Sequence, residues 1–208
     1  KDSYPFHPAV KDLFARFKEN PGFQQTRGLI RLMRTLVSRM FDPVNGWADK
    51  TALIAPYDID LNDMDTLSEI QNINPKLINA ISHDITGSGQ AIAEKLDDRY
   101  GNFISSQVAK LLLVSSLATV QNAIRGLKST EVIRNLCTPG IDIAKVQSEI
   151  LPELKNNCWY LHLDNSGNFL FKDVVNVVAK LQEYVRGYTQ ESIRQEIRKK
   201  LNEIFKPS

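Results

Sequence analysis

The chain has 208 residues, of which 42% are hydrophobic and 24% charged, and its formal net charge is +2. These values are ordinary for a globular protein with a sizeable core, and the net charge is too small to indicate nucleic-acid binding by itself. No run reaches the roughly 18 apolar residues that a transmembrane helix needs, and no segment resembles a signal peptide. We therefore expect a cytoplasmic protein without a membrane partner. Cys137 and Cys158 lack the spacing of zinc ligands, so no metal site is expected.

Charge is distributed unevenly along the chain. Residues 1–50 hold nine Lys or Arg against five Asp or Glu, whereas residues 51–100 hold three against nine. A basic N-terminal segment is thus followed by an acidic one. The pattern leaves open whether the two segments face each other.

Two helices are predicted at the N-terminus. The first covers residues 9–18 and ends at Asn20-Pro21-Gly22. The second runs from Gln24 to Phe41, with Arg27, Arg31 and Arg34 on one face. An arginine near a helix N-terminus opposes the helix dipole, which suggests an anionic partner for Arg27 such as a phosphate. The simpler alternative is an ordinary solvated basic face.

The next segment contains an acidic loop and three predicted helices. Asp58, Asp60, Asp63 and Asp65 follow one another closely, but Asp63 stands where a calcium-binding EF-hand loop requires glycine. Helix N-caps explain Asp63 and Asp65 more simply. Helices are expected at residues 64–72, 75–85 and 90–100, the last ended by Gly101.

Residues 103–173 show a different order of elements. A nearly all-apolar and therefore buried helix is expected at 105–124, and two further helices at 129–136 and 142–157. A β-hairpin then follows, with strands at 158–163 and 169–172. Three helices followed by a hairpin are typical of a winged helix. Helices at 174–185 and 190–205 close a chain that we expect to be mainly α.

Two stretches carry a family resemblance. Tyr4-Pro5-Phe6-His7-Pro8, together with Pro21-Gly22-Phe23-Gln24-Gln25-Thr26-Arg27-Gly28-Leu29-Ile30-Arg31-Leu32, resembles a segment of large prokaryotic AAA+-like P-loop ATPases. These form a family of unknown function that is similar to ATPases of phage-exclusion operons. Asn157-Cys158-Trp159-Tyr160-Leu161-His162 with Phe169-Leu170-Phe171-Lys172 gives a second match. The resemblance and the order of the elements together predict four parts: a helical lid segment of an ATPase (1–50), a helical middle (51–102), a winged-helix-like module (103–173) and C-terminal helices (174–208).

The resemblance also implies a role for the arginines. In the family the lid follows the nucleotide-binding core, and a lid arginine can sense the γ-phosphate of bound nucleotide. Arg27 holds that place, with Arg31 as second choice. The chain begins with Lys1 and lacks a Gly-x-x-x-x-Gly-Lys-Ser/Thr phosphate loop, so we expect a fragment that is not itself an enzyme. ATP and Mg²⁺ would be cofactors of the parent protein, and the fragment would hold none.

The resemblance thus predicts a non-catalytic regulatory fragment of a P-loop ATPase, and it suggests a role in phage defence. Its partners would be the ATPase core of the same polypeptide and, as an open possibility, protein subunits.

The alternative is a winged-helix module that binds nucleic acid. Its candidate recognition helix, residues 142–157, has a net charge of −1, which disfavours contact with a phosphate backbone. Basic residues also cluster in the last helix at Arg194, Arg198, Lys199 and Lys200, although acidic residues are interleaved with them. A free-standing enzyme finds no support, because His7, His83 and His162 belong to no local catalytic motif.

Overall fold

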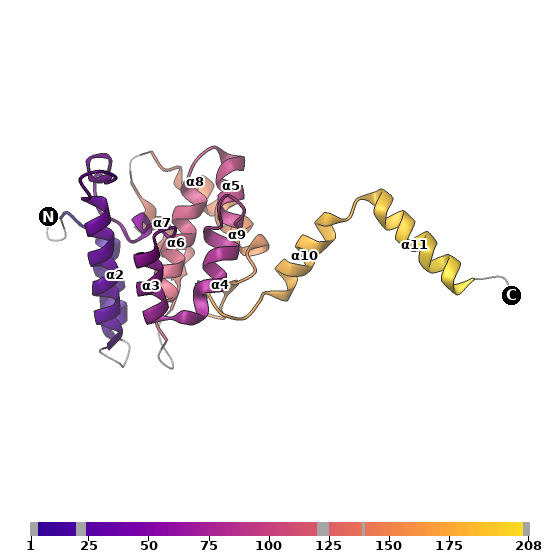
Figure 1. Cartoon of the computed structure of the whole chain (residues 1–208), viewed down its shortest axis with the longest axis horizontal. Helices are drawn as coiled ribbons and strands as arrows, with labels where there is room; N and C mark the ends of the chain where they lie inside the picture. The colour runs from indigo at the N-terminus through magenta and orange to yellow at the C-terminus, as the bar shows by residue number, and fades with distance from the viewer. Residues whose placement is uncertain (1–3, 20–23, 120–124, 139, 206–208) are drawn as a thin grey trace.

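The computed structural model describes residues 4–19, 24–119, 125–138 and 140–205. Helices dominate, as predicted, and among these residues the only β-sheet is a small three-stranded one. Most helices gather into one body, and the last helices extend from it as an arm (Figure 1).

The N-terminal helices form as predicted. α1 (Pro8–Glu19) contacts α2 (Gln24–Met40), and the predicted apolar side of α2 is buried. The segment before α1 is held by the extended residues around Ile54. His7 N donates to Ile54 O at 2.8 Å, and Ile54 N donates to Pro5 O at 2.9 Å. These bonds join the start of the chain to the acidic segment.

Helix α3 (Met64–Ile73) packs closely on α2. Asp63 caps it by accepting a hydrogen bond from Thr66 N at 2.9 Å, which confirms the predicted N-cap. A glycine permits the close approach, because a Cβ on Gly28 would lie only 2.6 Å from Ile73 Cγ1.

Ion pairs join the same two helices. Arg31 pairs with Glu69 at 3.2 Å, and Arg39 pairs with Asp63 at 2.9 Å and also with Asp65. The basic N-terminal segment and the acidic segment therefore do face each other.

The acidic segment continues through short helical turns. η1 (Ala48–Lys50) and η2 (Pro56–Asp58) precede α3. The helix predicted at 75–85 is a continuous run of η3 (Pro75–Leu77), α4 (Ile78–Ala80) and the π-helical η4 (Ile81–Ile85). α5 (Ile92–Tyr100) ends at Gly101, whose φ of 65° gives the expected left-handed cap.

Helix α6 (Ile104–Ser116) lies at the centre of the body and contacts η2, α5, η4 and α7 as well as the sheet. The prediction that it would extend to residue 124 is wrong for the described part, because residues 117–119 are not helical. Residues 120–124 lie outside the described residues. The helix ends where Ser115 Oγ and Ser116 Oγ donate back to Leu112 O at 2.8 and 2.6 Å, a local bond that competes with helix continuation.

The sheet contains the predicted hairpin and one strand that was not predicted. β2 (Leu161–Leu163) pairs with β3 (Asn168–Phe171), and β1 (Leu127–Lys128) pairs with the other edge of β3. The strand order is therefore β1-β3-β2, with both pairings antiparallel. Phe171 N donates to Ser116 Oγ at 2.9 Å, which fixes the sheet to the end of α6.

Between β1 and β2 the chain is helical. α7 (Ser129–Leu136) follows β1 directly. A second run comprises α8 (Ile143–Lys145), the π-helical η5 (Val146–Ile150) and α9 (Leu151–Asn157). Asp142 caps this run by accepting from Lys145 N at 3.1 Å. α7 and the run from Ile143 to Asn157 confirm the helices predicted at 129–136 and 142–157.

One cluster of buried apolar side chains extends from Val10 in α1 to Phe171 in β3. α10 (Val177–Gly187) contacts α9 at the edge of this body. α11 (Gln190–Ile204) lies beyond it and forms the far half of the arm (Figure 1). Within the described ranges, no helix is long and apolar enough to cross a membrane.

Candidate functional site

The N-terminal turn of α2 presents Arg27 to solvent, as the sequence predicts. The neighbouring Leu29 is buried, so the helix is fixed through its opposite face. Arg31 and Arg39, further along α2, pair with carboxylates of the acidic segment. For Arg27 no carboxylate of the described residues lies within ion-pair distance. Among these three arginines, Arg27 is therefore the one whose charge the described fold leaves uncompensated.

An apolar groove of about 700 Å³ lies beside this face, between α1 and α2. Phe6, Phe14 and Ile30 line its wall, and Lys11 and Arg34 are basic groups that also line it. Ile30 is half exposed, at 52%, and stands one turn after Arg27 on α2. The third arginine of the predicted stripe, Arg34, therefore belongs to a groove wall.

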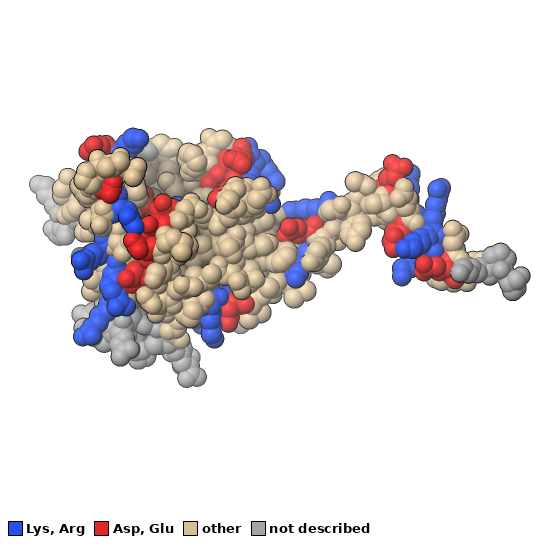
Figure 2. All heavy atoms as spheres, viewed as in Figure 1, with Lys and Arg blue, Asp and Glu red and all other residues tan. Residues whose placement is uncertain are grey.

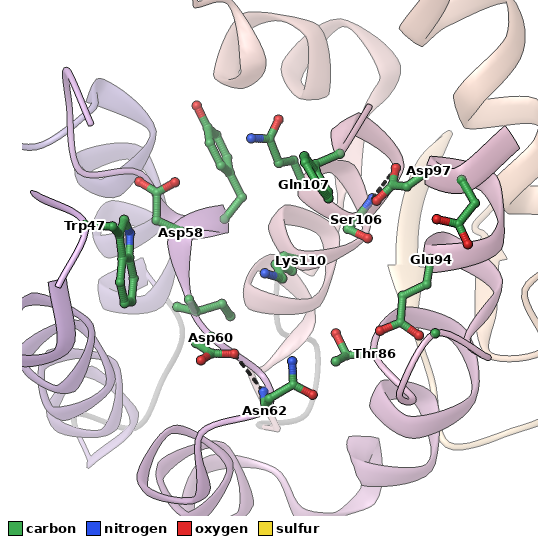
Figure 3. A pocket seen from close by; sticks show the side chains of 15 residues that line it. Trp47, Asp58, Asp60, Asn62, Thr86, Glu94, Asp97, Ser106, Gln107 and Lys110 are labelled. Atoms are coloured by element: carbon green, nitrogen blue, oxygen red, sulfur yellow. Dashed lines mark hydrogen bonds between the residues drawn. The ribbon is translucent and has the colours of Figure 1, made fainter. Parts of the chain in front are cut away.

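A second cleft, of about 600 Å³, lies between η2, α5 and α6. Figure 3 shows Lys110 of α6 near its middle, with Asp58, Asp60, Glu94 and Asp97 around it. The sequence drew attention to Asp58 and Asp60 but not to Lys110. This lysine lies in a helix whose neighbouring residues are almost all apolar and buried.

The carboxylates of this cleft are engaged by backbone groups. Asp97 accepts from Ser105 N at 2.7 Å and thereby holds the start of α6. Glu94 accepts from two backbone N–H groups of the preceding turn, at 3.0 Å each, and Asp58 accepts from Ala55 N at 2.7 Å. These side chains act as caps, because each one satisfies donors that would otherwise lack partners.

Burial governs the titration of the same groups. Desolvation lowers the pKa of Lys110, although the surrounding carboxylates oppose the shift. Desolvation likewise raises the pKa of Asp58 and of Asp97, and it raises the pKa of Tyr57 to about 12. The cleft is thus a partly buried cluster of opposite charges whose carboxylates already serve the backbone. We assign it a structural role.

A buried carboxylate joins η4 to the start of the hairpin. Asp84 is fully buried and accepts hydrogen bonds from Trp159 N at 2.9 Å and from Tyr160 N at 2.7 Å. His83 Nδ1 lies 2.7 Å from the same carboxylate, and the His83 ring is 4.0 Å from the Trp159 ring. No local sequence pattern indicates this cluster, because Asp84 and Trp159 are 75 residues apart along the chain.

The other two histidines have local structural partners. His7 is buried and its Nδ1 accepts from Ala9 N at 3.1 Å, while burial lowers its pKa. His162 lies in β2, as predicted, with Nε2 2.7 Å from Val174 O. Among the described residues, no group of three or more His, Cys, Asp or Glu side chains could hold a metal ion.

The residues of the nucleic-acid hypothesis lie far from Arg27. Arg194, Arg198, Lys199 and Lys200 are exposed on α11, at the opposite end of the molecule from α2 (Figure 1). Figure 2 shows acidic side chains interspersed with the basic ones on this arm. The two predicted sets therefore do not form one site.

The candidate recognition helix is also engaged within the fold. Lys145 lies 4.5 Å from the centre of the Tyr100 ring, and Glu153 pairs with Arg99 at 3.7 Å. One of its two lysines therefore already interacts with an aromatic ring of α5.

The chain matches no curated protein and no solved structure. A family model described as DUF499 second domain matches residues 1–101, about half of the chain. The matched part contains both N-terminal helices and ends at the left-handed Gly101 after α5. The first half of the chain is therefore similar to the second domain of a family of unknown function.

Proposed function

We propose that this chain is a non-catalytic, regulatory part of a larger P-loop ATPase, and that Arg27 senses nucleotide bound by another domain of the same polypeptide. The observation that carries the proposal is the exposed position of Arg27 in the N-terminal turn of α2, where no carboxylate of the described residues pairs with it. Arg31, the second candidate, is a weaker choice because its guanidinium pairs with Glu69.

The surroundings of Arg27 support contact with another domain. The apolar groove between α1 and α2 is open to solvent and has Lys11 and Arg34 in its lining. Exposed apolar surface next to basic side chains is typical of a docking surface for a partner with apolar and acidic groups. A neighbouring domain seated there would lie within reach of the first turn of α2.

The rigid packing of α2 would transmit such a contact. α2 is joined to α3 by the close approach at Gly28 and by two sets of ion pairs. Because packed helices move together, a displacement of α2 would be passed to the acidic segment and from there to α6.

The description of the matching family as a second domain is consistent with a multidomain parent. We propose in addition that residues 103–173 form a winged-helix module. The order helix, strand, helix, helix, hairpin, with strand order β1-β3-β2, supports this assignment. Its third helix is acidic overall, so we infer that the module contacts protein in preference to nucleic acid.

The test is Arg27→Ala in the intact protein that carries this segment. We expect ATP hydrolysis to fall at least about 10-fold, because a planar permanent charge would be removed from the phosphate. Arg27→Lys should recover only part of the activity. The exposed Arg194→Ala on α11 is the matched control and should leave the rate unchanged, while thermal melting of each variant checks the fold. Unchanged hydrolysis in Arg27→Ala would refute the role of this residue.

The nucleic-acid alternative makes a distinct prediction for the chain alone. Binding through Arg194, Arg198, Lys199 and Lys200 would weaken steeply as salt rises, because bound counterions are released from the nucleic acid. We expect no such binding of duplex or single-stranded DNA at 50 mM salt, as followed by fluorescence anisotropy. Salt-dependent binding that is lost when Arg194 and Arg198 are both replaced by alanine would favour the alternative.

A further inference from the structure

The arm formed by α10 and α11 exposes two rows of large apolar side chains. On α10 and just before it the row is Val174, Val177, Leu181 and Val185, and on α11 it is Ile193, Ile197, Leu201 and Ile204. Their exposed fractions lie between 42% and 74%. Such continuous exposure on two consecutive helices is unusual for a surface that faces only water.

Helix α10 is held to the body by its other face. Ala179 is buried there, Trp159 Nε1 donates to Glu183 at 2.6 Å, and Arg186 donates to Asn157. The polar face of this amphipathic helix therefore contacts the protein, while its apolar face points outward. This is the reverse of the usual arrangement, and it leaves the apolar row available to a partner.

The two rows match each other when one is read backwards. Within α10, Val177, Leu181 and Val185 are each four residues apart, and the same intervals separate Leu201, Ile197 and Ile193 on α11. An antiparallel pairing of α10 with α11 would therefore place Leu181 opposite Ile197 and Val177 opposite Leu201. Packing of side chains at this spacing is the ordinary way in which two helices bury apolar rows.

Charged side chains beside the two apolar rows are consistent with the same antiparallel register. Lys180 lies at the edge of the apolar row of α10, with Nζ 4.7 Å from the centre of the Trp159 ring. On the corresponding edge of α11, near Ile197, stands Glu196. The antiparallel register that aligns the apolar rows places these opposite charges close together.

We propose that a second copy of this chain covers the arm, with α10 of each copy packing against α11 of the other. The rows cannot meet in one chain as the structure stands, because α10 and α11 point apart (Figure 1). Only Tyr188 and Thr189 connect them, and Thr189 already caps α11 by accepting from Ser192 N at 3.2 Å. Connections this short are at the lower limit for a helical hairpin and favour exchange of helices between copies.

The exposed apolar surface of the arm approaches the area of a standard dimer interface. The eight side chains of the two rows, together with Val178, Tyr184, Tyr188 and Phe205, are exposed by roughly half or more on average. At on the order of 100 Å² for a fully exposed apolar side chain, they present about 700 Å² per copy. A standard stable interface buries about 800 Å² per partner. The two-fold exchange would also close on itself and not form a fibre.

The first experiment measures the mass of the 208-residue chain by light scattering over a range of concentrations. We expect a dimer whose dissociation constant rises about 100-fold in Ile197→Glu, with an unchanged circular dichroism spectrum. Gln195→Glu adds the same carboxylate on the opposite face of α11 and should leave the dimer intact. Lys180→Glu should weaken the dimer, and adding Glu196→Lys should restore it. A wild-type chain that stays monomeric at all concentrations would overturn the proposal.

A second experiment distinguishes exchange between copies from closure within one chain. Leu181→Cys and Ile197→Cys are made separately in a Cys137→Ser background, because Cys137 is exposed whereas Cys158 is buried. On mild oxidation we expect a covalent dimer from an equal mixture of the two variants, and little from either alone, since a disulfide requires close Cβ atoms. If the mixture gives no dimer while the double variant forms a disulfide within one chain, α11 folds back on its own α10 and the proposal is wrong.

Discussion

Asp84→Ala is expected to destabilise the protein by about 3–5 kcal/mol, a loss large enough to unfold many domains of this size. The side chain is fully buried and accepts the backbone N–H groups of Trp159 and Tyr160. Alanine would leave both part-buried N–H groups without this acceptor, so the free-energy cost of their desolvation would no longer be offset by a hydrogen bond. It would also free His83, which contacts both the carboxylate and the Trp159 ring.

The measurement is urea-induced unfolding of the wild type and three variants. Asp84→Asn keeps one acceptor oxygen but replaces the other with a donor, so we expect an intermediate loss of about 1–3 kcal/mol. Asp98→Ala removes an exposed carboxylate from α5 and should change stability by no more than about 0.5 kcal/mol. A loss below about 1 kcal/mol in Asp84→Ala would show that the junction between η4 and the hairpin does not depend on this carboxylate.

The elements that the sequence predicted well are those with a local signal. α2 could be placed because its apolar residues repeat at helical intervals, and α5 because Gly101 follows it. The hairpin could be placed because short aromatic-rich runs flank the turn at Asp164–Asn168. In each case the deciding residues lie within a few positions of one another, so the local sequence is enough to predict the element.

The features that the sequence did not reveal depend on distant partners. β1 has two residues and no strand-like pattern of its own, and it exists because β3 offers a free edge. α6 ends at Ser116 because that hydroxyl serves both Leu112 and the distant Phe171. Asp84 resembles an ordinary polar residue of a helix until Trp159 and Tyr160 are brought to it.

The candidate site was predictable only in part, for the same reason. The exposure of Arg27 follows from helical periodicity, but the pairing of Arg31 with Glu69 requires α3 to lie against α2. The uneven charge of the first hundred residues left such a contact open and could not fix its register. The cleft around Lys110 combines this lysine of α6 with carboxylates from two other segments, so no single stretch of sequence indicates it.

Gly126→Ala is also expected to have a large effect and to lower the free energy of unfolding by about 3–5 kcal/mol. Two independent terms contribute. The residue has a φ of 75°, which costs an L-amino acid about 1 kcal/mol or more. A Cβ at this position would also overlap the carbonyl oxygen of Phe169 and come within 2.8 Å of Leu170 Cβ. Because the obstacle includes the backbone of β3, no side-chain rotation can relieve it, and β1 would have to separate from β3.

Gly167→Ala isolates the first of these terms. Gly167 lies in the hairpin turn of the same sheet with a φ of 81°, but no atom lies within 4 Å of where its Cβ would be. Its replacement should therefore cost about 1–2 kcal/mol from backbone strain alone. The difference between the two variants in urea unfolding measures the close approach of β1 to β3. Equal losses would mean that the chain can shift at Gly126. In that case the hydrogen bond from Gly126 N to Ser115 O, at 3.0 Å, would not hold residue 126 in place against such a shift.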